Sequence, residues 1–248
     1  MSEDGAGRVS RGKLAVVVLL AAVFTTGFAA LGVWQIERRA WKLDLIARVD
    51  ARAHSDPTPA PGSADWPRVS ADTAEYRRVS LSGVFDNDRE TPVQAVSDYG
   101  AGFWILTPLK LDRGFTVLVN RGFVPPDRKD RASRPEGQPA GPVTVTGLMR
   151  ITEPKGAFLR ANDAEGDVWR SRDVAAIAEK RGVEGPVAPY FVDADATPNP
   201  GGLPIGGLTI IAFRNNHLVY ALTWFSLAVG TLVAAWLVLR RDGGREVR

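Results

Sequence analysis

Sulfur is almost absent from this chain, which has no cysteine and two methionines among its 248 residues. Disulfide bonds, thiolate ligation of zinc or iron–sulfur clusters, copper–thiolate transfer and cysteine nucleophiles are therefore excluded. Histidine is also scarce, because only His54 and His217 are present, and neither has the spacing of a metal site or a catalytic triad. The motifs of a nucleophile elbow, a P-loop, a zinc protease and a dinucleotide fold are missing too. The sequence therefore offers little support for an enzymatic function.

Two apolar runs without charged residues stand near the ends of the chain. The run over 14–33 has 20 residues and the run over 218–239 has 22. At about 1.5 Å per helical residue, each is long enough to cross a bilayer of roughly 30 Å. A cleaved signal peptide is the alternative for the first run, but its apolar part is too long and no A-x-A site follows it. The sequence thus predicts transmembrane helices over 14–34 and 217–239.

Basic residues near the second helix indicate its orientation. Four arginines follow it and only Arg214 lies close before it, which predicts a cytoplasmic C-terminus. Two crossings then give cytoplasmic tails over 1–13 and 240–248 and an extracytoplasmic, periplasmic domain over 35–216. No Arg-rich transit peptide precedes the first run, so we expect a multi-pass protein of the bacterial cell inner membrane.

The segment between the helices shows alternating strand patterns. They predict strands over 76–85, 102–111, 115–123, 143–151, 187–193 and 206–213, with a hairpin turn at 112–114 and a helix over 171–181. Residues 50–72 are rich in proline and predict a linker without packed structure. The expected fold class is a membrane protein in which two transmembrane α-helices flank a mainly antiparallel β (α+β) domain, a small sheet or a partly closed barrel.

Charged clusters in this domain carry little functional signal. Asp86 with Asp88, and Asp163 with Glu165 and Asp167, contain the oxygen ligands of a hard cation, but acidic residues in polar loops are usually turn residues. Most of the positive charge flanks the two spans, so we expect membrane lipid and no nucleic acid as a partner.

A polar and aromatic stripe at the start of the second span is the strongest candidate site. At 100° per residue, four side chains share one face of that helix: His217, Tyr220, Ala221 and Trp224. The end of the first span has a second stripe at the same depth: Gly27, Leu31, Trp34 and Arg38.

Together these stripes would frame a cleft for a flat apolar macrocycle with anionic side groups. The imidazole of His217 would be an axial ligand, and Arg38, Arg39 or Arg214 would meet the carboxylates. The alternative is structural, since Trp and Tyr are enriched at bilayer interfaces and a histidine there can bond to headgroups or to the outer domain.

Several motifs, in this order and spacing, resemble the surfeit locus protein one family of cytochrome c oxidase assembly factors. They are Leu31-Gly32 with Trp34-Gln35, Arg38 and Trp41-Lys42; Gly102-Phe103-Trp104 leading to Thr107-Pro108-Leu109; Val119-Asn120-Arg121-Gly122; Asn162-Asp163 with Trp169; and Asn216-His217-Leu218 with Tyr220-Ala221 and Thr223-Trp224. Phe123 stands where many members carry tryptophan, which keeps an aromatic side chain.

The resemblance implies a protein that is not an enzyme and that assists insertion of haem a into subunit I of cytochrome c oxidase. It implies transient binding of haem a, with His217 as the axial iron ligand and Trp34 beside the haem. On this hypothesis Tyr220 and Trp224 complete the walls, Arg38 or Arg214 meets the propionates, and haem a synthase is a second candidate partner. The alternatives are a haem-free scaffold for a subunit I intermediate and, further off, a membrane-tethered hydrolase.

Overall fold

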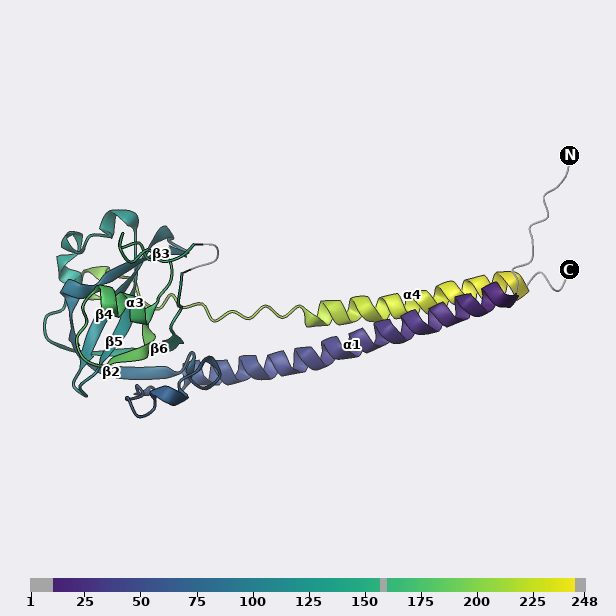
Figure 1. Cartoon of the computed structure of the whole chain (residues 1–248), viewed down its shortest axis with the longest axis horizontal. Coiled ribbons are helices and arrows are strands. Elements are labelled where there is room, and N and C mark those ends of the chain that lie inside the picture. Colours follow the sequence, from purple (N-terminus) through teal and green to yellow (C-terminus); the bar gives the residue numbers. More distant parts are fainter. Residues whose placement is uncertain (1–10, 157–159, 244–248) are drawn as a thin grey trace. The chain divides into compact units, whose positions relative to one another are not determined.

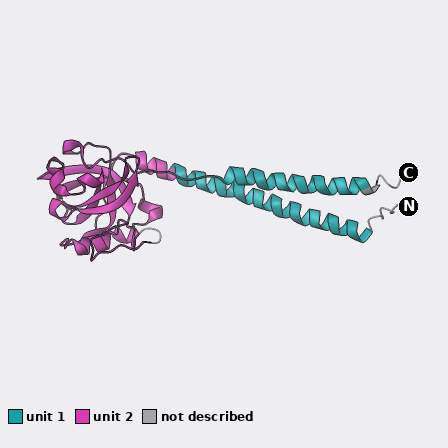
Figure 2. Ribbon diagram, turned by 90° about the horizontal axis from the view of Figure 1, so that it is seen from above, with its two compact units in different colours: residues 1–47, 212–248 teal, residues 48–211 magenta. Residues whose placement is uncertain are grey.

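The computed structural model describes residues 11–156 and 160–243, and these fall into two compact units. One unit, within 1–47 and 212–248, contains a pair of long helices, and the other, 48–211, contains the β-strands (Figure 1, Figure 2). Most of the two predicted tails, 1–10 and 244–248, lies outside the described residues. The predicted fold class is confirmed, because two candidate membrane-spanning helices flank a mixed α+β domain.

The helix pair consists of α1 (Arg11–His54) and α4 (His217–Gly243), and both are long and apolar enough to cross a membrane. Helix α1 runs 20 residues past the predicted end of its span at residue 34. No proline or glycine occurs between Gly32 and Pro57, so nothing in the chain interrupts the backbone hydrogen bonds there. Helix α4 begins at His217 and continues through Gly243.

The two helices lie side by side in antiparallel directions, with small residues where they meet (Figure 1, Figure 2). Ala221 and Ala228 of α4 are 0% and 7% exposed, while most apolar residues on the other faces are exposed. Small side chains allow close approach of helix backbones, which is how helices associate where the hydrophobic effect is weak. The less exposed positions alternate at spacings of four and three: Thr25, Phe28, Gly32 and Gln35 on α1, and His217, Ala221, Trp224 and Ala228 on α4.

The strands of the other unit form a seven-stranded sheet that closes on itself. Its order is β1-β2-β6-β7-β5-β4-β3, and a further pairing of β2 with β4 joins β2, β6, β7, β5 and β4 into a ring. Most neighbours are antiparallel, but β1 with β2 and β5 with β7 are parallel. The strands are β1 (Thr58–Pro59), β2 (Arg78–Phe85), β3 (Thr91–Ser97), β4 (Gly100–Leu111), β5 (Thr116–Val124), β6 (Pro142–Ile151) and β7 (Val187–Ala194).

Strand β5 is the centre of this unit, because all nine of its residues are buried. Val117 and Val119 belong to the cluster inside the barrel, and Leu118 points to a second cluster with Trp169 and Ile177. The second cluster packs under helix α3 (Val174–Lys180). The predicted β4–β5 hairpin is confirmed, and Gly114 at its turn has a φ of +81°, a conformation that favours glycine.

The prediction of an unpacked linker over 50–72 is wrong. Residues 50–54 complete α1, β1 pairs with β2, a 3-10 helix spans Trp66–Arg68, and α2 (Ala71–Ala74) begins after a capping box at Ser70. The Trp66 ring packs edge-on against Phe115, with centroids 5.6 Å apart, and Ala60 is 2% exposed. Proline fixes φ and so favours an extended chain, which here covers the barrel instead of hanging free.

Two further expectations need correction. The run over 206–213 is not a strand, since only Ile205 bridges to Phe123 and the φ of +74° at Gly207 interrupts the extended chain. Helix α3 begins at Val174 because Asp173, not Ser171, caps it by accepting from the Ala176 N–H. Strand β3 was not predicted. Short 3-10 helices also lie in segments where no helix or strand was predicted: Asn87–Arg89, Pro126–Arg128, Arg131–Ser133, Pro135–Gly137 and Pro200–Gly202.

Candidate ligand site on the helix pair

The imidazole of His217 faces the companion helix at the first residue of α4. Its Nδ1 donates to the side-chain oxygen Oε1 of Gln35 at 2.7 Å, and Gln35 is 8% exposed. Hydrogen bonding at one ring nitrogen fixes the tautomer, so the other nitrogen, Nε2, keeps its lone pair. This arrangement is the usual one for a histidine that ligates a metal through Nε2.

Gln35 belongs to one of the family motifs, but the sequence did not predict it as a site residue. Phe28, Gly32 and Gln35 do repeat at spacings of four and three, which is a pattern of helix contacts, but other positions of the apolar run repeat in the same way. Without the structure, nothing indicated which face of the nearly all-apolar first helix would meet α4.

The stripe predicted on the first helix lies beside the contact with α4 instead of in it. Trp34 and Leu31 are 53% and 39% exposed, and no atom lies within 4 Å of a Cβ placed on Gly27. At 100° per residue these positions are about a quarter turn from Phe28 and Gln35. The predicted cleft walls therefore form a flank of the helix pair.

Tyr220 of α4 lies on the same flank as Trp34. Trp34 comes one residue before the contact residue Gln35 on α1, and Tyr220 comes one residue before the contact residue Ala221 on α4. Because both helices are right-handed and they run antiparallel, this offset of about 100° places both side chains on the same side of the pair. The opposite flank carries Phe225, whose ring would lie 2.6 Å from a Cβ added to Gly32. Tyr220 is 54% exposed, so this flank presents two large amphipathic rings next to the imidazole.

Trp224 lies in the contact between the helices. Its ring stacks on that of Phe28, with centroids 5.7 Å apart and planes 24° apart, and Phe28 continues to Phe24 at 6.0 Å. In this arrangement Trp224 packs the helix pair about two turns after His217 along α4. Tyr220 and Trp34 are the predicted rings that remain free to meet a ligand.

The two predicted arginines are placed differently. The Arg38 guanidinium carbon lies 3.9 Å from the centre of the Trp41 ring on the same helix, and the side chain remains exposed. Arg214 precedes α4, is exposed, and makes no hydrogen bond or ion pair among the described residues. Lys42, which the sequence reading did not select, lies 5.1 Å from the Phe213 ring. Cationic groups thus lie on α1, at Arg38 and Lys42, and on the chain just before α4, at Arg214.

Three carboxylates of the predicted acidic clusters form ion pairs, and Asp163 accepts a hydrogen bond from the Gly166 N–H at 2.9 Å. Asp86 pairs with Arg89, Asp88 with Arg131, and Asp167 with Arg181 at 2.8 Å. Within 11–156 and 160–243 no group of three His, Asp or Glu side chains is arranged to hold a metal ion. These carboxylates therefore stabilise loops.

A buried charge network occupies the edge of the barrel. Asp193 is 3% exposed and accepts hydrogen bonds from four side chains: Asn120 at 2.8 Å, Arg150 at 2.9 Å, Thr209 at 2.9 Å and Arg172 at 3.2 Å. Burial lowers the pKa of Arg150, but the charges of Asp193 and nearby acidic groups raise this pKa by a larger amount, so the net pKa shift is upward. The network is internally satisfied, which is typical of a structural role.

The fold and the site define a class: membrane-anchored proteins in which two apolar helices carry a β-barrel domain and meet at a histidine oriented by a glutamine. Residues 22–229 match the SURF1 family. Surfeit locus protein 1 of Homo sapiens is 36% identical over 232 residues, covering 87% of this chain and 74% of the human protein. That of Rattus norvegicus is 36% identical over 217 residues, covering 81% and 68%, and the SURF1-like protein of Monosiga brevicollis is 39% identical over 232 residues, covering 87% and 84%. The chain belongs to the SURF1 family, as its motifs indicated.

Proposed function

We propose that this protein is a cytochrome c oxidase assembly factor without enzymatic activity of its own, which binds haem a through His217 and assists its insertion into subunit I. The observation that carries the proposal is the 2.7 Å hydrogen bond from His217 Nδ1 to Gln35. It orients the ring and leaves Nε2 as the nitrogen that can ligate iron.

The flank of the helix pair suits the haem plane. Trp34 and Tyr220 would lie against the macrocycle from the two helices, while Trp224 supports the site from within the helix contact. Arg214, which has no carboxylate partner among the described residues, and Arg38 would meet the propionates. A bound haem supplies an iron centre with one protein ligand; the chain's residues bind it, orient it and shield it.

A single histidine ligand fits a protein that must release its haem. Two strong protein ligands would hold the iron on both faces, whereas one imidazole leaves the second face open to a ligand of the acceptor. The absence of cysteine and the scarcity of methionine favour haem over copper as the cargo, because copper delivery normally uses soft ligands.

The proposed location is the bacterial cell inner membrane, with both helices spanning it. The arginines after α4 favour cytoplasmic termini and a periplasmic barrel domain. The proposed partners are subunit I, haem a synthase as the source of the haem, and membrane lipid around the helices.

The two histidines of the chain provide a matched test. Full-length protein is purified from cells that make haem a, together with His217→Ala and His54→Ala. His54 is exposed and bonds only to Asp50 of its own helix among the described residues, so its loss should leave the haem content unchanged. His217→Ala should lose most of the haem and its Soret band. If His217→Ala keeps the haem content and spectrum of the unmodified protein, the ligand assignment is wrong.

A haem-free scaffold is the second candidate, and the closeness of the helix contact favours it. Gln35 is 8% exposed and Gly32 lies directly under the Phe225 ring, so the helices meet without space for a macrocycle between them. A scaffold should co-purify with subunit I equally when haem a synthesis is blocked. The haem chaperone predicts that this association, or the haem loading of subunit I, falls when synthesis is blocked.

A further inference from the structure

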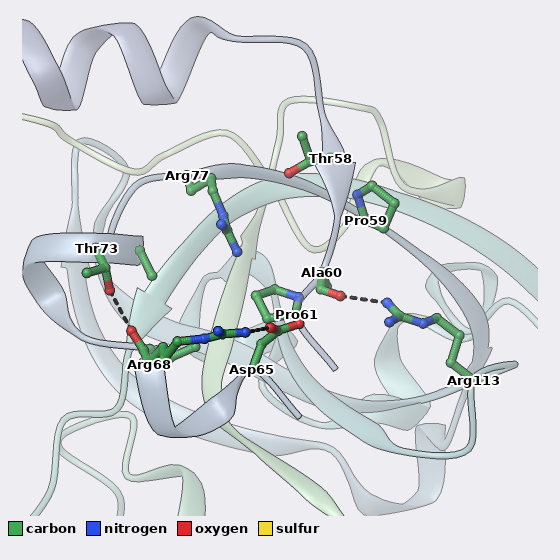
Figure 3. A pocket seen from close by; sticks show the side chains of 11 residues that line it. Thr58, Pro59, Ala60, Pro61, Asp65, Arg68, Thr73, Arg77 and Arg113 are labelled. Carbon is green, nitrogen blue, oxygen red and sulfur yellow. Dashed lines mark hydrogen bonds and ion pairs between the residues drawn. The ribbon is translucent and has the colours of Figure 1, made fainter. Parts of the chain in front are cut away.

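A cavity of about 570 Å³ opens in the barrel domain, well separated in sequence from the helix-pair site (Figure 3). Its wall comes from the chain that follows α1, from the 3-10 helix and α2, and from the turn of the β4–β5 hairpin. Three arginines and one carboxylate line it: Arg68, Arg77, Arg113 and Asp65. The cavity thus contains more positive than negative charge.

Within the part of the chain that the structure describes, two of the three guanidinium groups form no ion pair with a carboxylate. Arg68 forms an ion pair with Asp65, which uses the one acidic group of the cavity. Arg113 donates from Nη1 to the carbonyl oxygen of Ala60 at 2.6 Å. The side chain of Arg77 makes no hydrogen bond or ion pair among the described residues, and its Nε is buried without an acceptor. Figure 3 shows the Arg77 side chain extending into the cavity.

Arg77 and Arg113 act on the same part of the cavity wall. The Tyr190 hydroxyl donates to the carbonyl oxygen of Pro61 at 2.7 Å, behind the cavity. Burial raises the pKa of Tyr190, and the charges of Arg113 and Arg77 both oppose that rise in pKa. Both positive charges are therefore felt at one hydroxyl group.

Among the described residues of the wall, Arg77 Nε is a buried donor without an acceptor, whereas two backbone carbonyl groups of the wall already accept hydrogen bonds. The Ala60 carbonyl accepts from Arg113, and the Pro61 carbonyl accepts from Tyr190 and from Trp66 Nε1 at 3.2 Å. A buried N–H without an acceptor destabilises the fold, so a ligand that supplies an acceptor would be stabilised here.

We propose that this cavity binds a phosphate group in its dianionic form, held between Arg77 and Arg113. A phosphate monoester carries close to two negative charges at pH 7 and matches two guanidinium groups, whereas a carboxylate carries one. Guanidinium groups also match the geometry of phosphate oxygens. The phosphate belongs to a soluble phosphomonoester or to a lipid headgroup such as phosphatidic acid. This site is independent of haem binding at His217.

The test measures binding of inorganic phosphate to the full-length protein in uncharged detergent, by isothermal titration calorimetry in chloride buffer. We expect saturable binding at one site, and at least about tenfold weaker binding after Arg77→Gln or Arg113→Gln. Arg128→Gln is the matched control, because Arg128 is a half-exposed arginine of the same domain outside the cavity, and it should bind as the unmodified protein does.

A second variant separates loss of charge from loss of structure. Thr58 is exposed at the rim of the cavity, so Thr58→Trp should obstruct it while all three arginines remain. It should weaken phosphate binding with little change in the melting temperature. Absence of saturable phosphate binding, equal binding of acetate, or unchanged binding after both Arg77→Gln and Thr58→Trp would overturn the proposal.

Nanodiscs distinguish the two sources of the phosphate. If the natural ligand is a lipid headgroup, phosphatidic acid in the disc should abolish binding of added phosphate relative to discs of phosphatidylcholine alone. If the natural ligand is a soluble phosphomonoester, the protein should bind added phosphate equally in both kinds of disc, and glycerol phosphate should compete with phosphate in both. Either result supports the site and assigns its source.

Discussion

The polar groups of the helix pair and of the barrel differ in how many of their hydrogen-bonding positions are used. In the barrel, the buried Asp193 carboxylate accepts four hydrogen bonds and has no capacity left over. In the helix pair, the imidazole of His217 uses one nitrogen to bond to Gln35 and keeps the other. Saturated polar groups stabilise a fold, whereas a group that is oriented but only half used is available to a ligand. The comparison indicates a stabilising role for the barrel network and is the reason why we propose the helix pair, and not the barrel network, as the haem site.

The largest expected effect comes from opening the barrel network with Asp193→Asn. This change removes the carboxylate charge that Arg150 and Arg172 share, while Glu75 and Glu153 still pair with them. Loss of a hydrogen-bonded charged partner costs about 1.5–3 kcal/mol. The free energy of unfolding of the barrel, followed by tryptophan fluorescence in urea, should fall by that amount. Asp127→Asn, in an exposed pair with Arg128, should change it by less than about 1 kcal/mol. If the two variants lose equal free energy of unfolding, the buried carboxylate of Asp193 is no more important for stability than the exposed carboxylate of Asp127.

The next effect sharpens the role assigned to the helix pair. Gln35→Leu removes the acceptor at His217 Nδ1 but keeps the ligating ring, and loss of such an orienting partner typically lowers metal affinity about 10- to 100-fold. Haem affinity measured by absorbance titration should fall within that range. Gln35→Glu keeps an acceptor and should retain binding. If Gln35→Leu binds haem as tightly as the unmodified protein, the hydrogen bond only holds the helices together.

A smaller effect is expected from widening the helix contact. A Cβ on Gly32 would lie 2.6 Å from the Phe225 ring, while one on Gly27 has open space, so Gly32→Ala should weaken the pair by about 1 kcal/mol and Gly27→Ala should not. Because the chain has no cysteine, spin labels on cysteines introduced at Val23 and Val229 report the helix separation specifically. The distance distribution should broaden only for Gly32→Ala, and broadening in both variants would contradict the observed face of contact.

The smallest effect concerns pH. Burial raises the pKa of Glu153, but hydrogen bonds and charge from Arg172 outweigh it and set the pKa below the usual 4.5. A lowered pKa gives stability that is present above 4.5 and is lost as the pH falls through the folded-state pKa. At most about 1 kcal/mol is expected, because Glu153 is partly exposed. The difference in melting temperature between the unmodified protein and Glu153→Gln should therefore shrink between pH 6 and pH 3; a constant difference would contradict this origin.

Local patterns predicted the elements whose stabilising contacts are close in sequence. The β4–β5 hairpin followed from two alternating runs around Asp112-Arg113-Gly114, and α4 followed from its charge-free run. The sequence did not predict β3, because its polar Thr91 is buried, its apolar Val96 is exposed and Pro92 lies within it. Its partner is the long strand β4. It also missed the packing over 50–72, because proline-rich composition says nothing about which surface an extended segment will cover.

By itself, the sequence determined the two apolar spans, the α+β domain between them, the family, and the face of α4 that carries His217. Those properties depend on composition, on the 3.6-residue period and on motifs, all of which are local. Only the tertiary structure decided that Gln35 and not Trp34 meets this histidine, that β2 pairs with β4 to close the barrel, and that Arg77 stands without a carboxylate. A uniformly apolar helix has no marked face, and partners far apart in the chain are selected by packing of the whole fold.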